Sequence, residues 1–594
     1  MKKKIPFSII PAILLCGILP FIVRLHIEEI DLWNYPWFPN QSQWGDFFLY
    51  GKMQLFLVIS VGVAMILLDT FFIKNEKVLF EKSWFLLLAY SILCLLSAAF
   101  SQHKEISFHG SIEQYESVWV LVGYCVVCCY GFSIAKSREN IACIGGIFAV
   151  VAIALGILGV SQLVHKDFLS WSVIQNLLVP DSLAEYKDNI QFNFSQESTK
   201  SVYMTFYNPN YAGVFSGMMI PVLVGVSCSS SRKWLRVLAT LAVILQTICL
   251  IGSGSKSAIA ALIVVGVVFG VFLCIRDRKR YKLIFLVAVS FLFLWLGYDF
   301  ILGNHSITAF VEGFSFGERD YGLEDIQVEN DKVKVTFCGE QFSFWQEKQN
   351  GSPALYLADE SGKLMAYEYN AEENACVPEK EELKDILLGC YEKHGISYIF
   401  MEYKELRWMF TNETEDGGYT YLTLYGKADK IEKAETCFSE KLDGAFTYRG
   451  YIWNRTIPLL KQHILLGSGP DTFLVTFPQN DYVARAAAKK GFFTEILTRP
   501  HNMYLQTALQ TGVISLVCML GFMGIILCNV VKKIKSYSKA EESSVEAKML
   551  PAILGGVLVY LISGIANDST VAVAPFFWLL LGIMSGLSNK KTVK

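Results

Sequence analysis

Residues 237–275 of this chain read VLATLAVILQTICLIGSGSKSAIAALIVVGVVFGVFLCI. The run is apolar apart from one short break, GSGSK at 252–256. A helix that crosses a bilayer needs about 20 apolar residues, so the run supplies two spans joined by a tight turn. This length and pattern indicate a chain that folds inside a membrane.

Apolar stretches of the same kind recur on both sides of this run. Of the 594 residues, 53% are hydrophobic and 18% are charged, and the mean hydropathy is +0.38. Soluble domains carry about 25% charged residues, so these values exclude a soluble class. We expect an all-α polytopic membrane protein with about twelve transmembrane helices, at about 5–23, 51–73, 85–100, 118–135, 141–164, 211–230, 237–253, 257–275, 283–302, 510–531, 551–566 and 569–587.

The basic residues of the connections between these stretches predict the orientation. They fall on alternate connections, at 2–4, 74–82, 136–138, 232–233, 276–282, 532–535 and 590–591. Cytoplasmic loops carry the excess of Lys and Arg, so both termini are expected on the inner side of the cytoplasmic membrane. The connections expected on the outer side are 24–50, 101–117, 166–209, 252–256 and 303–509.

Residues 303–448 differ in composition from the rest of the chain. They are rich in acidic residues and alternate polar with apolar side chains, as in KVKVTF at 332–337. The alternation predicts an inserted, mostly β (α+β) domain outside the membrane, with one helix near 379–393. The remainder divides into a transmembrane body at 1–302, an extracytoplasmic loop at 449–509 and C-terminal transmembrane helices at 510–594. An acidic module in a basic, apolar frame argues against a nucleic-acid partner.

The motifs of soluble enzymes are missing from the chain. The sequence has no P-loop, no dinucleotide-binding glycine pattern, no HExxH and no nucleophile elbow in a suitable context. Cys125, Cys128 and Cys129 have CxxC spacing but lie within an expected span without polar neighbours, which favours apolar packing over metal binding. We therefore expect no cofactor and no metal, and look for chemistry among polar residues at the outer membrane face.

Two polar clusters adjoin expected spans at that face. The segment TFYNPNY at 205–211 offers Asn208 and Asn210 as ligands; alternatively, Asn210 simply caps the helix that follows. Lys256 lies in the turn between two apolar spans, where an unpaired charge is costly. We therefore expect its amine to pair with a negatively charged group. The alternative for Lys256 is a side chain that extends its amine to the interfacial water.

A third polar cluster occupies residues 449–512. It contains RGYIW from Arg449, LGSGPDTF at 466–473 and RPHNMYL from Arg499. His501 and Asn502 lie at an expected helix start, where an imidazole can take a proton from a hydroxyl or donate to a phosphate oxygen. The alternative is a histidine that only caps the entry to the next span.

The order of these motifs resembles the O-antigen ligase and polymerase family of membrane glycosyltransferases. The sequence has Thr-Phe-x-Asn-Pro-Asn-Tyr, Gly-Ser-x-Ser, Arg-Gly-x-x-Trp, Leu-Gly-Ser-Gly-Pro-Asp-Thr-Phe and Pro-His-Asn-x-Tyr-Leu-Gln, in that order between residue 205 and about 520. The resemblance implies a metal-independent, inverting glycosyltransferase with a GT-C-like fold. Such enzymes move a polyprenyl-diphosphate-linked glycan to an acceptor hydroxyl outside the cytoplasmic membrane.

The resemblance also implies roles for individual residues. Arg449 and Lys256, and after them Arg499, are the expected cations for the leaving diphosphate, since negative charge develops there. His501 matches the family's loop histidine, as base or as diphosphate ligand, which makes 449–509 the expected catalytic loop. The family often has Arg where Lys256 stands, and another Arg before its Asn-Pro-Asn, where this chain offers only Lys200. Asn208, Asn210 and Asn502 complete the expected substrate-binding set.

The resemblance leaves several alternatives open. The product is either a polymer or a glycan ligated to another acceptor, so the acceptor is a glycan or a lipid, and polysaccharide-assembly proteins are candidate partners. In the inserted domain Trp345, Tyr403, Trp408 and Tyr425 are either sugar-stacking faces or the core of a sheet. A glycolipid transporter or flippase is the alternative function, and a sensor or assembly protein is a third.

Overall fold

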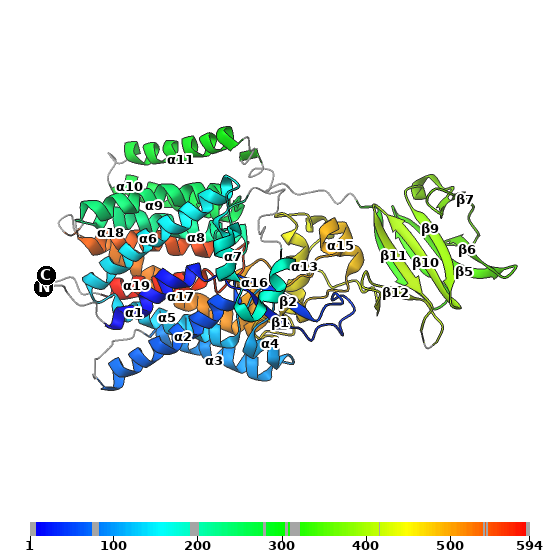
Figure 1. Ribbon diagram of the computed structural model, residues 1–594, viewed down its shortest axis with the longest axis horizontal. Helices are drawn as coiled ribbons and strands as arrows, with labels where there is room; N and C mark the ends of the chain where they lie inside the picture. Colours follow the sequence, from blue (N-terminus) through cyan, green and yellow to red (C-terminus); the bar gives the residue numbers. More distant parts are fainter. Residues whose placement is uncertain are drawn as a thin grey trace.

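The fold has a helical body at one end and β-sheets at the other, joined by a layer of short helices (Figure 1). A computed structural model describes residues 7–73, 82–190, 201–276, 281–302, 307–308, 321–414, 416–537, 541 and 544–589. In that layer the short helices α13 (Arg449–Leu459) and α15 (Tyr482–Ala488) lie between the body and the sheets (Figure 1).

Seven helices among the described residues are long and apolar enough to cross a membrane. These are α2 (Tyr50–Leu68), α6 (Arg138–Leu163), α8 (Pro209–Ser229), α9 (Lys233–Gly252), α10 (Lys256–Arg276), α17 (Val513–Ser536) and α18 (Val545–Ser563). The chain is therefore a polytopic membrane protein with a β-sheet region, as expected.

Further helices occupy the other expected apolar stretches. They are the helical run Ile10–Phe21, which begins with α1 (Ile10–Ile13), and α3 (Trp84–Phe100), α5 (Val118–Ile134), α11 (Tyr281–Leu302) and α19 (Ala574–Ser588). Each of the twelve stretches thus contains a helix, and twelve membrane crossings stay a prediction. The turn expected at 252–256 separates α9 from α10, with Gly254 in the left-handed conformation at φ 64°.

Close helix packing in the body depends on small residues. Helices α5 and α19 approach so closely that a methyl group at Gly582 would overlap the backbone of Cys128. Association of helices in lipid relies on such contacts, because lipid tails are as apolar as the side chains themselves. Large apolar side chains such as Phe85 and Phe300 are exposed on the outside of the body, where lipid would cover them.

The two larger sheets are antiparallel throughout. One has the order β3-β4-β5-β6, and the other has the order β13-β12-β11-β10-β9-β8-β7. Their strands are β3 (Leu323–Val328), β4 (Val333–Phe337), β5 (Glu340–Gln349), β6 (Ser352–Asp359), β7 (Tyr367–Asn370), β8 (Ala375–Pro378), β9 (Leu387–Lys393), β10 (Ile396–Tyr403), β11 (Leu406–Thr411), β12 (Thr420–Leu422) and β13 (Ala428–Asp429).

The helix expected near 379–393 is wrong. That segment holds one short 3-10 turn, Glu381–Leu383, followed by β9. Its Glu, Lys and Leu content favours a helix locally, but β9 pairs with β10 over its full length and buries Leu388 in the core. Tertiary burial overrides helix propensity here.

The core of the sheets includes residues from outside them. Tyr482, Val483 and Phe493 belong to the expected loop 449–509, yet they pack among the buried side chains of the strands. Tyr403 and Trp408 are buried in the same core, which favours the structural alternative for these two aromatic residues. The sheet region and the loop therefore share one hydrophobic core.

The connection at 24–50, which is expected on the outer side, also forms hydrogen bonds to the sheet region. It forms the hairpin of β1 (His26–Glu29) and β2 (Gln43–Asp46). The Lys427 amine donates to the carbonyl of Phe38 at 2.9 Å, and the Asn40 amide donates to the carbonyl of Tyr425 at 2.7 Å. Segments expected on the outer side thus gather at one end of the body.

The layer between body and sheets is built of short helices. Those within 449–509 are α13 (Arg449–Leu459), α14 (Phe473–Thr476) and α15 (Tyr482–Ala488), and α16 (Met503–Thr511) follows. Two more lie in other outer connections, α4 (Lys104–His109) and α7 (Ser172–Leu178).

Candidate functional site

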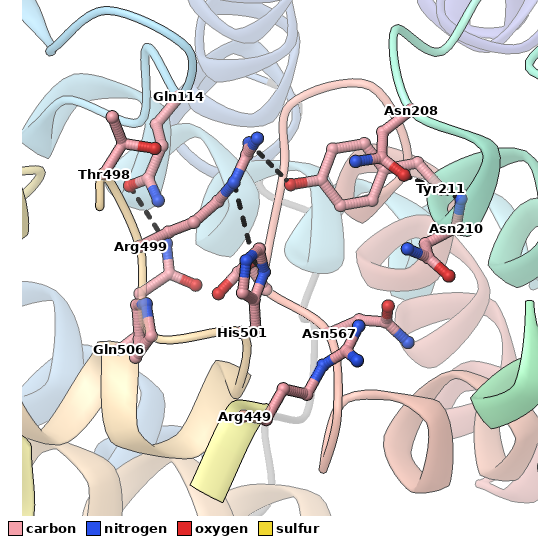
Figure 2. Close-up of polar contacts among 12 residues, drawn as sticks. Gln114, Asn208, Asn210, Tyr211, Arg449, Thr498, Arg499, His501, Gln506 and Asn567 are labelled. Carbon is pink, nitrogen blue, oxygen red and sulfur yellow. Dashed lines mark hydrogen bonds and ion pairs between the residues drawn. The ribbon is translucent and has the colours of Figure 1, made fainter. Parts of the chain in front are cut away.

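Polar side chains from six segments converge where this layer meets the helical body. The segments are 110–116, 207–211, 256–257, the start of α13, 498–502 and 567–569. In Figure 2, Arg449, Arg499 and His501 lie around one space together with Tyr211 and Asn567. Four of the five sequence motifs therefore contribute to a single site.

His501 is paired with a buried carboxylate that the sequence did not reveal. Its Nδ1 lies 2.9 Å from Oδ2 of Asp568, in the loop between α18 and α19. A carboxylate can only accept, so Nδ1 carries the proton and Nε2 is left as an acceptor. The His501 side chain is 31% exposed and Asp568 only 1%, so the imidazole is reachable while its partner is not.

The charges around this pair set its protonation. Burial lowers the pKa of His501, and Arg449 and Arg499 lower it further, against the opposing effect of Asp568. Burial alone would raise the pKa of the Asp568 carboxyl, but His501, Arg499 and Arg449 hold it below its usual value. At neutral pH the pair is therefore a neutral imidazole on a carboxylate, which is the form that can accept a proton.

Arg499 is occupied by protein groups on several sides. Its Nη1 donates to the carbonyl of Glu113 at 3.1 Å and to the hydroxyl of Tyr211 at 2.9 Å. Its Nη2 lies 3.5 Å from the Glu113 carboxylate, and its Nε lies 3.9 Å from Asp568. This saturation, with a side chain only 8% exposed, indicates that Arg499 holds neighbouring segments together.

Arg449 differs from Arg499 in how far protein groups occupy its guanidinium. It extends from the start of α13 towards His501 and Asn567 (Figure 2). Its Nε is buried and has no hydrogen-bond partner among the described residues, and its Nη1 makes a 3.3 Å bond to the carbonyl of Phe446. Burial lowers its pKa, although Asp568 opposes the shift. A buried donor without a partner is costly, so this guanidinium is prepared for an anionic ligand.

The start of α13 is held by a buried ion triad. Arg455, six residues further along the helix, lies 3.0 Å from the Asp443 carboxylate and 2.5 Å from that of Asp481. Gly450 lets the helix approach the preceding turn, because a methyl group there would overlap the carbonyl of Leu442. These contacts fix the position from which Arg449 extends.

The segment 205–211 forms one wall of the site. Asn208 caps α8, since its Oδ1 accepts the backbone N–H of Asn210 at 2.8 Å, so the expected cap is present but at Asn208 instead of Asn210. The carbonyl of Thr205 accepts a 2.7 Å bond from Lys52. The Tyr207 hydroxyl donates to Glu113 at 3.1 Å, which ties this wall to Arg499.

The start of α10 reaches the site through Asn567. The Asn567 amide donates to the hydroxyl of Ser257 at 2.6 Å, beside half-buried Lys256. Asn567 precedes Asp568, so the turn carrying Lys256 adjoins the loop that carries the carboxylate. Asn502 accepts the backbone N–H groups of Tyr504 and Leu505 and so caps α16. Lys200 lies outside the described residues.

A second buried carboxylate, that of Glu116, lies near Asp568. Glu116 accepts hydrogen bonds from Tyr124 at 2.5 Å, Ser569 at 2.8 Å and Gln506 at 3.1 Å. Burial raises the pKa of Glu116 to about 7, against these hydrogen bonds. It lines a cavity of about 20 Å³, room for about one water molecule. Since Ser569 follows Asp568, this network fixes the loop that presents Asp568 to His501.

Residues 411–520 match a family described as O-antigen ligase. The matched segment contains Arg449, Arg499, His501 and Asn502, and it runs from the end of β11 into α17. The resemblance expected from the motifs is thus confirmed for this part of the chain. No curated protein matches the chain.

Proposed function

We propose that this chain is a membrane glycosyltransferase that moves a glycan from a polyprenyl-diphosphate donor to an acceptor hydroxyl at the outer face of the cytoplasmic membrane. The match to O-antigen ligase supports the reaction class. The observation that carries the site assignment is the His501–Asp568 pair, 2.9 Å apart. It lies next to the Nε of Arg449, which has no hydrogen-bond partner within the part of the chain that the structure describes. A base and an anion-binding cation are the two groups that this transfer requires.

His501 acts as the base in this proposal. Its Nε2 takes the proton of the acceptor hydroxyl, while the hydroxyl oxygen attacks the anomeric carbon of the donor sugar. The bond from that carbon to the diphosphate oxygen breaks as the new glycosidic bond forms, and its electron pair leaves with the diphosphate. Asp568 stabilises the imidazolium and keeps the ring in the required tautomer. Attack opposite the leaving group inverts the anomeric centre.

Arg449 is the proposed ligand of the leaving diphosphate. It has an unsatisfied donor in a buried position, so its attraction to the growing negative charge is little screened by water. Lys256 is the second proposed cation, since its turn adjoins the Asn567–Asp568 loop. Lysine acts as a point charge without the two-pronged geometry of arginine, so diphosphate placement relies on Arg449. Arg499 is proposed as a positioning residue, because Glu113 and Tyr211 already occupy it.

The proposal is tested with the purified protein in lipid nanodiscs. A polyprenyl-diphosphate oligosaccharide is added without any other acceptor, and the products are separated by size. Longer lipid-linked glycans would establish a polymerase, whereas transfer only to an added wall glycan or lipid would establish a ligase. His501→Ala should abolish transfer. His463→Ala, which removes another histidine of the same loop, should retain it. Equal activity of the two variants would overturn the assignment of His501.

A further inference from the structure

Four large side chains immediately before Arg449 are exposed to solvent. Phe438 is 53% exposed, Leu442 40%, Phe446 45% and Tyr448 37%. We call these four residues the aromatic ledge. In the 449–509 loop that follows, most aromatic rings are buried, so the ledge is a local departure from the packing beside it. Exposed apolar groups gathered at one place indicate a binding surface.

The backbone of the ledge is held in an unfavourable conformation. Phe446, Thr447 and Tyr448 have successive φ values of 53°, 60° and 65°, the left-handed region that residues with a side chain rarely enter. The turn is kept there by backbone bonds from Gly450 to Ala445 and from Tyr451 to Asp443. Strain of this kind persists where surrounding structure enforces it, and it gathers at ligand-binding sites.

The ledge is connected to both functional groups of the site, directly to Arg449 and through Trp453 to the segment that carries His501. The carbonyl of Phe446 accepts the bond from Arg449, and the Phe446 ring packs on Trp453 with centroids 5.4 Å apart. The Trp453 indole donates to the carbonyl of Pro500 at 2.9 Å, and Pro500 precedes His501. A molecule that rests on Phe446 is therefore next to both the proposed base and the proposed diphosphate ligand.

The charged residues around the ledge favour an aqueous occupant. Lys433 and Glu440 form a 2.9 Å ion pair, and exposed Lys441 stands between Phe438 and Leu442. Such a surface would be costly to bury among lipid tails. Sugar rings combine C–H faces that stack on aromatic rings with hydroxyls that bond to a charged rim, so they suit this surface.

We propose that the aromatic ledge is the acceptor subsite, where the sugar bearing the attacking hydroxyl stacks on Phe446 and Tyr448. This inference rests on the proposed transferase function. It assigns a place to the acceptor, which must present its hydroxyl to His501 while the donor diphosphate occupies Arg449. The polyprenyl chain of the donor lies in the membrane, so the acceptor arrives from the water-exposed side that the ledge faces.

The test measures the KM for acceptor and the KM for donor in separate titrations. The double variant Phe446→Ala/Tyr448→Ala is compared with wild type in nanodiscs, with acceptor oligosaccharide titrated at saturating donor and donor titrated at saturating acceptor. We expect the KM for acceptor to rise by about tenfold, with the KM for donor unchanged, since each lost ring contact costs binding only on the acceptor side. Tyr391→Ala removes a ring of similar exposure, 40%, from β9 and should change neither constant.

Two controls keep the outcomes distinct. Phe446→Tyr with Tyr448→Phe preserves both rings and should restore the wild-type KM, which a mere loss of folding would not predict. Direct binding of the acceptor oligosaccharide, followed by calorimetry without donor, should be lost in the double alanine variant. An unchanged KM for acceptor in the double alanine variant, or acceptor binding that survives both substitutions, would overturn the assignment of the ledge as the acceptor subsite. If the wild type binds the oligosaccharide on the ledge but transfers nothing, the proposed function fails and the subsite stands.

Discussion

Asp568→Asn is the sharpest perturbation of the proposed mechanism. It keeps the size of a side chain that is 1% exposed, and it removes only the charge that faces Nδ1 of His501 at 2.9 Å. A hydrogen bond to a charged group contributes about 1.5–3 kcal/mol, so its loss in the transition state slows the reaction about 10- to 150-fold. The amide can also donate to Nδ1, which would leave the proton on Nε2 and remove the base. A tautomer error of that kind costs up to about 10⁴-fold in kcat.

The assay is the initial rate of transfer in nanodiscs, with kcat and both KM values measured at pH 7.5. We expect kcat to fall by about 10² to 10⁴ while both KM values stay near wild type, because Asp568 touches neither substrate. Asp471→Asn is the matched control. Burial raises the pKa of Asp471. Its Oδ2 accepts the backbone N–H groups of Ser111 and Glu116, and an amide oxygen can accept the same bonds, so asparagine replaces it at little cost. A kcat for Asp568→Asn within threefold of the Asp471→Asn value would refute the role of the pair.

Three further predictions concern cations and backbone. Arg449→Met should lower kcat/KM for donor by about 10²-fold, and it should move the acid limb of the pH–rate profile to higher pH, because Arg449 lowers the pKa of His501. Arg449→Lys keeps the charge, so an acid limb that also moves in that variant would contradict the electrostatic explanation. Arg499→Met leaves Glu113 without its buried partner and should cost about 3 kcal/mol, seen as a lower melting temperature in a thermal shift assay; an unchanged melt would show that Arg499 is not structural. Gly450→Ala should displace Arg449 and reduce both stability and transfer, whereas Gly62→Ala, where a methyl group meets nothing within 4 Å, should do neither when the two are melted and assayed in parallel.

Local composition was sufficient to predict where the apolar helices lie. Hydropathy depends on neighbouring residues alone, and a helix is the only way for a single apolar segment to satisfy its backbone in lipid. The tight turn before Lys256 and the strands of 321–429 follow from equally local patterns. The error at 379–393 arose where a local preference met a distant strand, because β10 determines the structure of β9.

The candidate site was only partly visible in the sequence. His501, Arg449 and Arg499 stood in motifs, but Asp568 was hidden at the edge of an expected span that began at 569. The structure places α19 from Ala574, so the polar run from Asn567 lies in a loop, and that run was the available signal. Glu113 offered no signal, because its role depends on Arg499, 386 positions away. Contacts of that range come from the fold and not from any local pattern.

The hydrophobic core that the strands share with the 449–509 loop constrains how the two segments can evolve. Tyr482, Val483 and Phe493 complete the interior of the sheets, while Lys427 anchors those sheets to the chain before α2. Strands taken from a related protein would not pack against Tyr482, Val483 and Phe493 of the loop. Substitutions in the insertion and in the loop must therefore occur together. Their cohesion predicts correlated substitutions across this boundary and a single unfolding step for both. Selection on the reaction and selection on the extra sheets would therefore act on one inseparable unit.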